Sequence, residues 1–337
     1  MSHAPLISFA SVVLAVTLAS CAAHQPVGPA PAAVPGPWTH EFVELAGWGD
    51  DGPLRMHYLA AGPKDAPRVV LLHGFPDMAY GWRDVIPLLA DDHRVLAPDL
   101  RGYGATDRPE GGYGVRELAD DIVSFIAATN GSDGLPADTR VHLVTHDWGS
   151  ATGWFVAMQH PEALLSFTAT SVPHPAAWVR FLKEDDAQRK RATYQKQLSQ
   201  PGVAGFLGSL TRRQVGKLYR SDLVDPAVFT EEHLAVYRAA MQGAEGWRAP
   251  LRYYQRAQAD QAETAAFLST APPVSVPVLL MWGEQDGYLY SRQAPMTCEY
   301  VTPGPCEVEV FDDAGHFVQW DVPARYVARW REFTAPR

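Results

Sequence analysis

After residue 40 the sequence alternates between short apolar segments and segments with helical spacing of apolar residues. The short segments are rich in Val and Leu and are closely followed by turn residues, as buried strands of parallel sheets are. They occupy residues 68–72, 94–97, 140–145 and 278–281. Helical spacing is present at residues 82–90 and 117–128. This alternation predicts an α/β fold, with a mostly parallel sheet flanked by helices on both faces.

Two departures from the alternation define the expected domain organisation. Residues 41–45 and 54–59 come first and predict a hairpin. Residues 173–270 are helix-rich, lack strand patterns and contain a charge run at 183–191, which we interpret as a solvated helix face. We therefore expect an inserted helical cap at 173–270. The two parts of the α/β core are expected at 39–172 and 271–337.

Charge and composition exclude several classes of protein. Of 337 residues, 28 are Lys or Arg and 38 are Asp or Glu, so the formal net charge is −10, which argues against a nucleic-acid partner. Hydrophobic residues make up 47% of the chain, which excludes wholesale disorder. Three cysteines are too few for a disulfide scaffold or a four-cysteine zinc site. The oligomeric state is left open.

The first residues predict a targeting signal rather than part of the fold. Residues 6–18 form an apolar run that is too short to span a bilayer but is typical of an export signal. The run ends in Leu18-Ala19-Ser20-Cys21, which resembles the bacterial lipoprotein box and implies cleavage before Cys21 and a lipid on that cysteine. A positively charged start is missing, so an uncleaved leader is the alternative. We expect an export signal at 1–20, an Ala/Pro-rich tether at 21–38, and a periplasmic or lipid-anchored bacterial protein.

The other two cysteines lie close together near the C-terminus. Cys298 and Cys306 are eight residues apart around a Thr-Pro-Gly sequence that is typical of a turn. Export to an oxidising compartment would allow them to pair. Two unpaired thiols are the alternative.

A candidate nucleophile follows the third strand segment. Thr145-His146-Asp147-Trp148-Gly149-Ser150 lies between a strand and the helical segment 151–159, which is the context of a nucleophile elbow. Asp147 holds the usual serine position, and a carboxylate can attack an alkyl carbon to form an ester. The helix N-terminus behind it would keep the carboxylate ionised. The alternative is that Asp147 merely caps this helix.

Residues that would support such a nucleophile follow other strand segments. His73-Gly74-Phe75-Pro76 comes after the first, and the backbone N–H groups of Phe75 and Trp148 are the expected oxyanion hole. His73 is interpreted as a structural hydrogen-bonding residue, because a better base exists.

A candidate acid and base come near the C-terminus. Asp286 follows the last strand segment and His316 comes later, so the chain order is nucleophile, acid, histidine. His316 is the candidate general base, and Asp286 would orient its ring and stabilise the imidazolium. Glu284 is the weaker rival to Asp286, and Asp312 and Asp313 are interpreted as turn or capping residues.

From about residue 40 to the end, the chain resembles the soluble epoxide hydrolases of the α/β-hydrolase superfamily, whose nucleophile is an aspartate. The resemblance is carried by His73-Gly74-Phe75-Pro76 and by APDLRGYG at 97–104, HDWGS at 146–150 and SVPHP at 171–175. It implies two cap tyrosines whose hydroxyls point at the substrate oxygen. Residues 193–204 are similar to the first tyrosine segment and place that role on Tyr194, and LRYY at 251–254 places the second on Tyr254. The alternative for each tyrosine is an ordinary buried aromatic residue.

The implied activity is hydrolysis of a small apolar epoxide to a vicinal diol through an ester on Asp147, without a metal or organic cofactor. A haloalkane dehalogenase would use the same nucleophile, but its halide pocket usually needs Asn where Phe75 stands. A fluoroacetate dehalogenase carries Arg just after the nucleophile, and residues 148–151 contain none. A serine esterase is disfavoured by Asp147. A surface-anchored binding protein without turnover is the alternative from another class.

Overall fold

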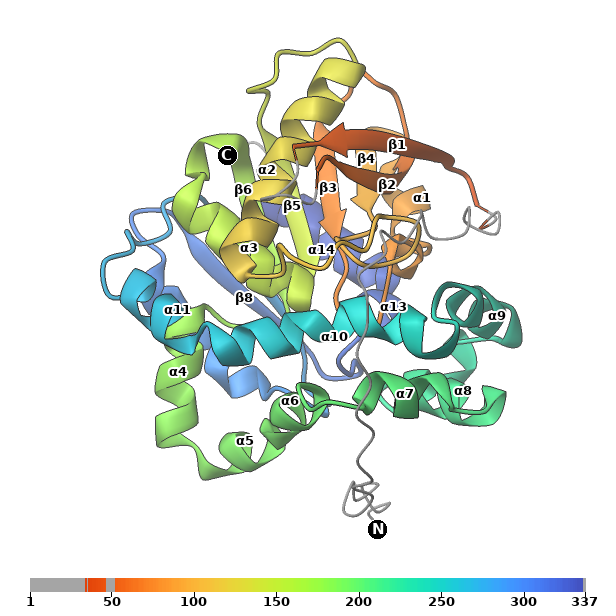
Figure 1. The fold of residues 1–337 in the computed structure, drawn as a ribbon. Helices are drawn as coiled ribbons and strands as arrows, with labels where there is room; N and C mark the ends of the chain where they lie inside the picture. The colour runs from red at the N-terminus through yellow and green to blue at the C-terminus, as the bar shows by residue number, and fades with distance from the viewer. Residues whose placement is uncertain (1–33, 35, 47–51, 336–337) are drawn as a thin grey trace.

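The computed structural model describes residues 34, 36–46 and 52–335 (Figure 1). Their core is one eight-stranded sheet in the order β1-β2-β4-β3-β5-β6-β7-β8. The strands are β1 (Thr39–Leu45), β2 (Leu54–Ala61), β3 (Arg68–Leu72), β4 (Arg94–Pro98), β5 (Val141–His146), β6 (Leu164–Thr170), β7 (Val278–Gly283) and β8 (Cys306–Phe311). β2 runs antiparallel to β1 and β4, and all other neighbours are parallel. The expected α/β fold with a mostly parallel sheet and a leading hairpin is confirmed.

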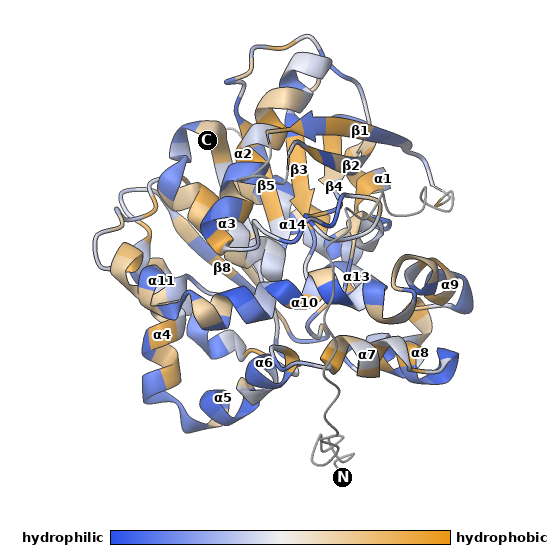
Figure 2. Cartoon of the chain, viewed as in Figure 1, coloured by the Kyte–Doolittle hydropathy of each residue, from blue (hydrophilic) through white to orange (hydrophobic). Residues whose placement is uncertain are grey.

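Alternate side chains of each central strand point to opposite faces of the sheet. Both sets are buried because helices cover both faces. On β3, Val70 and Leu72 join one apolar cluster, which includes residues of α2 (Val115–Ser132) and α3 (Trp148–Gln159). Val69 and Leu71 join the other, which includes residues of α1 (Ile86–Leu89) and α14 (Pro323–Thr334). Figure 2 shows the result as hydrophobic colour along β3 and β4, whereas the outlying helix α5 is largely hydrophilic.

A group of helices separates β6 from β7 in the chain. They are α4 (Pro175–Glu184), α5 (Asp186–Arg191), α6 (Thr193–Leu198), α7 (Val203–Gly208), α8 (Arg212–Arg220), α9 (Glu231–Ala240), α10 (Gly243–Ala259) and α11 (Gln261–Leu268). We refer to residues 173–270 as the cap. In Figure 1, α10 crosses between the sheet and the lower helices, and it packs against α6 and α7. The charge run is split by Asp185, whose side chain caps α5, and only Gln188 within it is buried.

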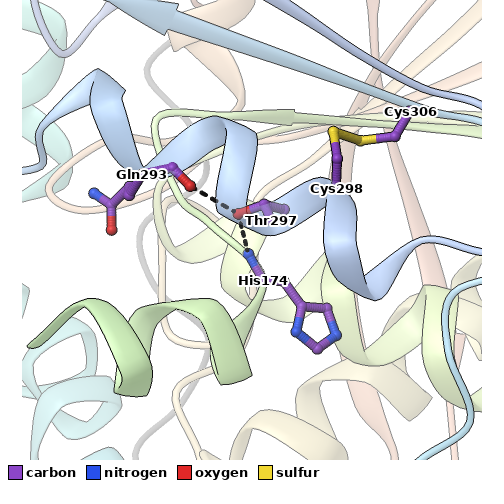
Figure 3. Close-up of a disulfide and its surroundings, with 5 residues drawn as sticks. All are labelled: His174, Gln293, Thr297, Cys298 and Cys306. Carbon is purple, nitrogen blue, oxygen red and sulfur yellow. Dashed lines mark hydrogen bonds between the residues drawn. A yellow bond between two sulfur atoms is a disulfide. The ribbon is translucent and has the colours of Figure 1, made fainter. Parts of the chain in front are cut away.

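Short helical turns complete the chain. They are η2 (Ala79–Trp82), η3 (Pro161–Ala163), η4 (Pro226–Val228), η5 (Ser291–Gln293), η6 (Cys298–Tyr300), α12 (Ala294–Thr297) and α13 (Val318–Asp321). Cys298 follows α12, and its sulfur is bonded to that of Cys306 at the start of β8 (Figure 3). This bond ties the connection between β7 and β8 to the edge strand β8.

Three details of the fold differ from the sequence prediction. The prediction of a continuous helix at 82–90 is wrong, since the end of η2 and the single turn α1 lie there. Pro87 has no N–H to donate, and its ring would clash with the carbonyl of residue 83 in a continuous helix. β6 and β8 were not predicted. β6 is buried yet carries polar side chains that bond to other elements, such as Thr170 to Tyr326. β8 is an edge strand whose Glu307 and Glu309 pair with Arg329.

The predicted leader at 1–20, Cys21 and most of the 21–38 tether lie outside the described residues. Within the described part of the chain, no helix is long and apolar enough to span a bilayer.

Candidate active site

Asp147 lies in the tight turn between β5 and α3. Its backbone has φ 50° and ψ −119°, a conformation that costs energy for any residue other than glycine. The turn also needs small neighbours. A Cβ on Gly149 would lie 2.4 Å from the carbonyl oxygen of Leu72, and one on Gly74 would lie 2.4 Å from the Cβ of Asp147. Although Asp147 precedes α3, its side chain makes no capping hydrogen bond, so the simple helix-cap interpretation is wrong.

Asp147 is only 7% exposed, and both oxygens of its carboxylate have neighbouring polar groups. The Phe75 N–H donates to Oδ1 at 2.7 Å, and Oδ2 lies 3.6 Å from Nε2 of His316. Burial alone would raise the pKa of Asp147, but hydrogen bonding and charge from His316 outweigh burial and lower it below 3.8. Trp148 is the first residue of α3, so its N–H has no carbonyl partner within that helix. The two expected oxyanion-hole residues therefore adjoin the same carboxylate.

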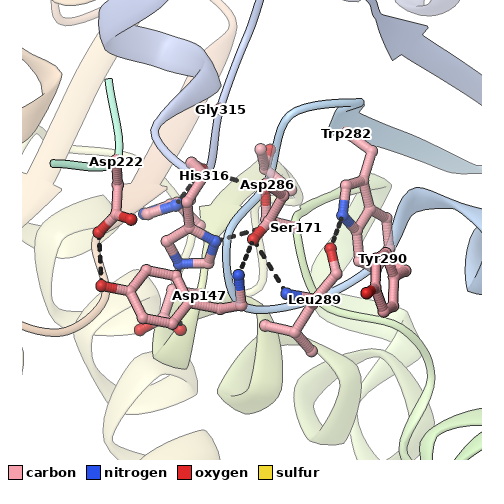
Figure 4. Close-up of polar contacts among 12 residues, drawn as sticks. Asp147, Ser171, Asp222, Trp282, Asp286, Leu289, Tyr290, Gly315 and His316 are labelled. Carbon is pink, nitrogen blue, oxygen red and sulfur yellow. Dashed lines mark hydrogen bonds and ion pairs between the residues drawn. The ribbon is translucent and has the colours of Figure 1, made fainter. Parts of the chain in front are cut away.

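His316 and Asp286 form a buried pair beside Asp147 (Figure 4). Nδ1 of His316 lies 2.9 Å from Oδ2 of Asp286, whose other oxygen accepts the N–H groups of Tyr288 and Leu289 at 2.7 and 2.9 Å. Burial would lower the pKa of His316, but the charges of Asp286 and Asp147 raise it well above 6.5. The two carboxylates therefore favour the imidazolium form of the histidine in the free protein.

The backbone that carries His316 is fixed by hydrogen bonds from neighbouring strand ends. Its carbonyl oxygen accepts from Nε2 of His146 at 2.9 Å and from the hydroxyl of Ser171 at 3.1 Å. The preceding Gly315 N–H donates to Asp321 at 2.8 Å. The ring of His146 also lies 4.8 Å from the His316 ring, centroid to centroid. These bonds come from the end of β5, the residue after β6, and α13, so strand ends and a short helix together set the position of the histidine.

The rival acidic residues are directed elsewhere. Glu284 accepts a hydrogen bond from Ser291 at 2.5 Å, and Asp313 pairs with Arg325 at the surface. His73 is also occupied: it accepts the Leu100 N–H at Nε2, and burial lowers its pKa to about 4. The contacts of Glu284, Asp313 and His73 therefore agree with structural rather than catalytic roles.

Tyr194 on α6 and Tyr254 on α10 approach Asp147 from the cap. Their ring centroids are 6.4 Å apart. Burial, followed by the negative charge of Asp147, raises the pKa of each phenol above 10.0, so both remain protonated at neutral pH. The adjacent Tyr253 differs, because its hydroxyl donates to the carbonyl oxygen of Arg101 at 2.8 Å.

Two residues that sequence reasoning did not single out also reach this site. Tyr288 packs against His316 with ring centroids 5.0 Å apart, and its hydroxyl donates to Asp222 of the cap. The only sequence signal that could have placed Tyr288 at the site is its position two residues after Asp286. Asp222 had none, since it lies in a cap segment without a motif.

Among the described residues, no group of three or more His, Cys, Asp or Glu side chains is arranged to hold a metal ion. The acidic and imidazole groups at the site instead pair with one another. The chemistry that this arrangement supports directly is nucleophilic attack by a carboxylate, followed by base-assisted hydrolysis.

Comparisons with known proteins agree with the fold. Residues 67–323 match the family described as alpha/beta hydrolase fold. Epoxide hydrolase 2 of Caenorhabditis elegans is 30% identical over 295 residues, which cover 85% of this chain and 77% of that protein. The AB hydrolase superfamily protein YfhM of Bacillus subtilis is 31% identical over 277 residues, 80% of this chain and 91% of that protein. The crystal structure of epoxide hydrolase VrEH1 from Vigna radiata aligns with a TM-score of 0.73 and 26% identity, over 88% of this chain and 97% of that one. The chain therefore belongs to the α/β-hydrolase family, and relatives named epoxide hydrolases are among its matches.

Proposed function

We propose that the protein is an epoxide hydrolase that opens an epoxide through an ester on Asp147 and releases a vicinal diol. One observation carries the proposal: a buried carboxylate at a strained turn lies between a His–Asp pair and two protonated phenols from the cap. The relatives named epoxide hydrolases support the choice of substrate.

The attacking atom in this proposal is Oδ2 of Asp147. Oδ1 is already bound to the Phe75 N–H, so it is placed to become the ester carbonyl oxygen within the oxyanion hole. As Oδ2 bonds to a ring carbon, the C–O bond of the epoxide breaks and the oxygen leaves as an alkoxide. Tyr194 and Tyr254 supply hydrogen bonds to this oxygen, and one of them transfers its proton.

Formation of the ester changes the role of His316. It removes the negative charge of Asp147, which is one of the two charges that raise the pKa of the imidazole. The imidazolium therefore loses its proton more readily, and that proton restores the phenol. The histidine becomes a base only once the ester exists, which prevents idle deprotonation of water before substrate is bound.

Neutral His316 then takes a proton from water, and the resulting hydroxide attacks the ester carbonyl carbon. The oxyanion forms on Oδ1, held by the N–H groups of Phe75 and Trp148. Collapse of this intermediate breaks the bond between the carbonyl carbon and Oδ2. The diol leaves with Oδ2, and His316 returns its proton to the departing oxygen. The water oxygen is left on Asp147 as part of a carboxylic acid, and the proton of that acid passes to His316. The carboxylate and the imidazolium are thus both regenerated, and Asp147 carries one oxygen from water.

The experiment is a panel of epoxides, haloalkanes and esters assayed with purified protein, together with mass analysis of His316→Ala. We expect epoxide turnover in the wild type, none in Asp147→Ala, and an adduct of one substrate mass in His316→Ala. In a single turnover in ¹⁸O-water the label should enter Asp147 rather than the diol. Label entering the diol directly, without any adduct, would show direct attack by water, and turnover of haloalkanes alone would show a dehalogenase.

A further inference from the structure

A residue of the cap reaches the catalytic histidine through a tyrosine. Asp222 follows α8, and its carboxylate accepts a hydrogen bond from the hydroxyl of Tyr288. Tyr288 belongs to the loop after β7, which also carries Asp286. The bond therefore joins the cap to the core at the candidate active site.

Tyr288 is held at both ends. Its N–H donates to Oδ1 of Asp286 at 2.7 Å, and its hydroxyl is bound by Asp222. Between these anchors its ring packs against the His316 ring in a T-shaped arrangement, with centroids 5.0 Å apart and an interplanar angle of 68°. Since His146 lies 4.8 Å away in its own contact with that imidazole, the His316 ring has an aromatic neighbour from β5 and another from the loop after β7. Tyr288 also contacts the ring of Tyr194, at 5.1 Å.

The same cap segment is attached to the histidine loop by a second, independent set of contacts. The carboxylate of Asp321 accepts the N–H of Val224 at 3.1 Å and the N–H of Gly315 at 2.8 Å. The backbone oxygen of Asp222 also lies against Gly315, where a Cβ would come within 2.2 Å of it. Loss of the Tyr288 hydroxyl therefore frees the Tyr288 ring without detaching the cap segment.

The ionisation of Asp222 suits it to this bond. Burial raises the pKa of Asp222 to about 6, against the opposing effects of the Tyr288 hydrogen bond and the charge of His316. At neutral pH the group is mostly a carboxylate, which is a stronger acceptor for a phenol than a neutral acid is. Burial, followed by the charge of Asp222, raises the pKa of Tyr288 well above 10.0, so the phenol keeps its proton.

We propose that Asp222 and Tyr288 are positioning residues for the hydrolytic step: the hydrogen bond fixes the Tyr288 ring, which holds the imidazole of His316 at the angle needed to deprotonate water. The inference rests on the proposed function. Asp286 fixes one nitrogen of the imidazole, but a single hydrogen bond leaves the ring free to tilt. The contact with Tyr288 restricts that tilt. Because Asp222 comes from the cap, hydrolysis of the ester is thereby coupled to the seating of the cap on the core.

The test separates the rate of ester formation from the rate of ester hydrolysis, by rapid quenching and intact-mass analysis with an epoxide that the wild type turns over. Tyr288→Phe and Asp222→Ala should each slow hydrolysis by about tenfold to a hundredfold, as misplacement of a catalytic group does. Ester formation should change little, so the ester accumulates. The double variant should be no slower than either single variant, because both remove the same bond. Asp222→Asn should recover most of the hydrolysis rate, since its amide oxygen still accepts from the phenol.

Tyr237→Phe is the matched control. Tyr237 on α9 donates to Asp77 of the core at 2.6 Å, so it is another cap-to-core bond between a phenol and a carboxylate. Its loss should lower Tm without changing the ratio of the two rates. The inference is overturned if Tyr288→Phe and Asp222→Ala keep the wild-type ratio, or if Tyr237→Phe changes the ratio equally. If the wild type itself forms no ester with any epoxide, the proposed function fails as well.

Discussion

Replacement of Asp286 by asparagine should stall the protein after the first chemical step. Oδ1 of Asp286 already accepts two backbone N–H groups, from Tyr288 and Leu289. An asparagine would keep its carbonyl oxygen there and turn its NH₂ group toward Nδ1 of His316. That nitrogen would then have to accept a hydrogen bond, which moves the imidazole proton to Nε2. Nε2 is the atom that faces Asp147, so the base would lose the lone pair that it needs.

The size of the effect follows from the burial of the pair. Asp286 and His316 are each 3% exposed, so loss of the carboxylate charge is poorly compensated by solvent. Removing one partner of a buried ion pair costs about 3–5 kcal/mol, which corresponds to roughly 10²- to 10⁴-fold in rate. This loss falls on hydrolysis, where His316 must become an imidazolium as it deprotonates water. Attack by Asp147 does not require the histidine as a base, so we expect ester formation to stay within about tenfold of the wild type.

Stopped-flow fluorescence can follow both steps, because Trp148 is adjacent to the nucleophile. Asp286→Asn should show a rapid change of full amplitude followed by very slow turnover, with the ester detected by intact-mass analysis. Asp313→Asn, which alters an exposed carboxylate paired with Arg325, is the control and should behave as the wild type. If Asp286→Asn turns over slowly without accumulating an ester, then attack has become the slow step and the argument from tautomer and charge is refuted.

Three further predictions test other parts of the site. Tyr194→Phe and Tyr254→Phe should each slow epoxide opening by about a hundredfold to a thousandfold, as loss of one oxyanion donor does. Tyr253→Phe, whose hydroxyl is bonded to a backbone carbonyl, should mainly lower Tm, and equal kinetic loss in all three variants would argue against a specific role for the first two. Because the pKa of His316 is raised by Asp286 and Asp147, the stabilisation from this group is fully present below pH 6.5 and is lost as the pH rises through the raised value. The Tm advantage of the wild type over His316→Ala should therefore shrink as the pH is raised above 6.5 through the raised pKa of His316, and a constant difference would contradict the charge assignment. We also propose that residues 1–20 direct export and that Cys21 carries a lipid, so Cys21→Ser should release the protein from bacterial membranes. Equal membrane partition of the two proteins would rule out the anchor.

Much of the fold was determined by patterns that are local in the sequence. Each apolar segment at 68–72, 94–97 and 278–281 is buried on both faces, and such a segment must be apolar wherever its neighbours lie. Asp147 and Asp286 are local in the same sense, because each follows an apolar strand segment and parallel strands end at one edge of the sheet. His316 was named from the chain order nucleophile, acid, histidine. The sequence was therefore sufficient to name three residues that the structure brings together.

Only the tertiary structure decided the properties that depend on contacts between distant segments. The strand β6 tolerates polar residues because other elements bond to their side chains, as Tyr326 does to Thr170. The strand β8 tolerates them because it lies at the edge of the sheet, where Glu307 pairs with Arg329. Neither condition is visible in the local sequence. The difference between Tyr253 and Tyr254 has the same origin. The hydroxyl of Tyr253 donates to the carbonyl oxygen of Arg101, whereas Tyr254 lies near enough to Asp147 for that charge to raise its pKa. The bond between Asp222 and Tyr288 spans 66 residues and joins the loop of Asp286 to a cap segment without a motif. Such contacts depend on how the cap packs on the sheet. That packing results from all residues of the chain together, so no local sequence pattern predicts it.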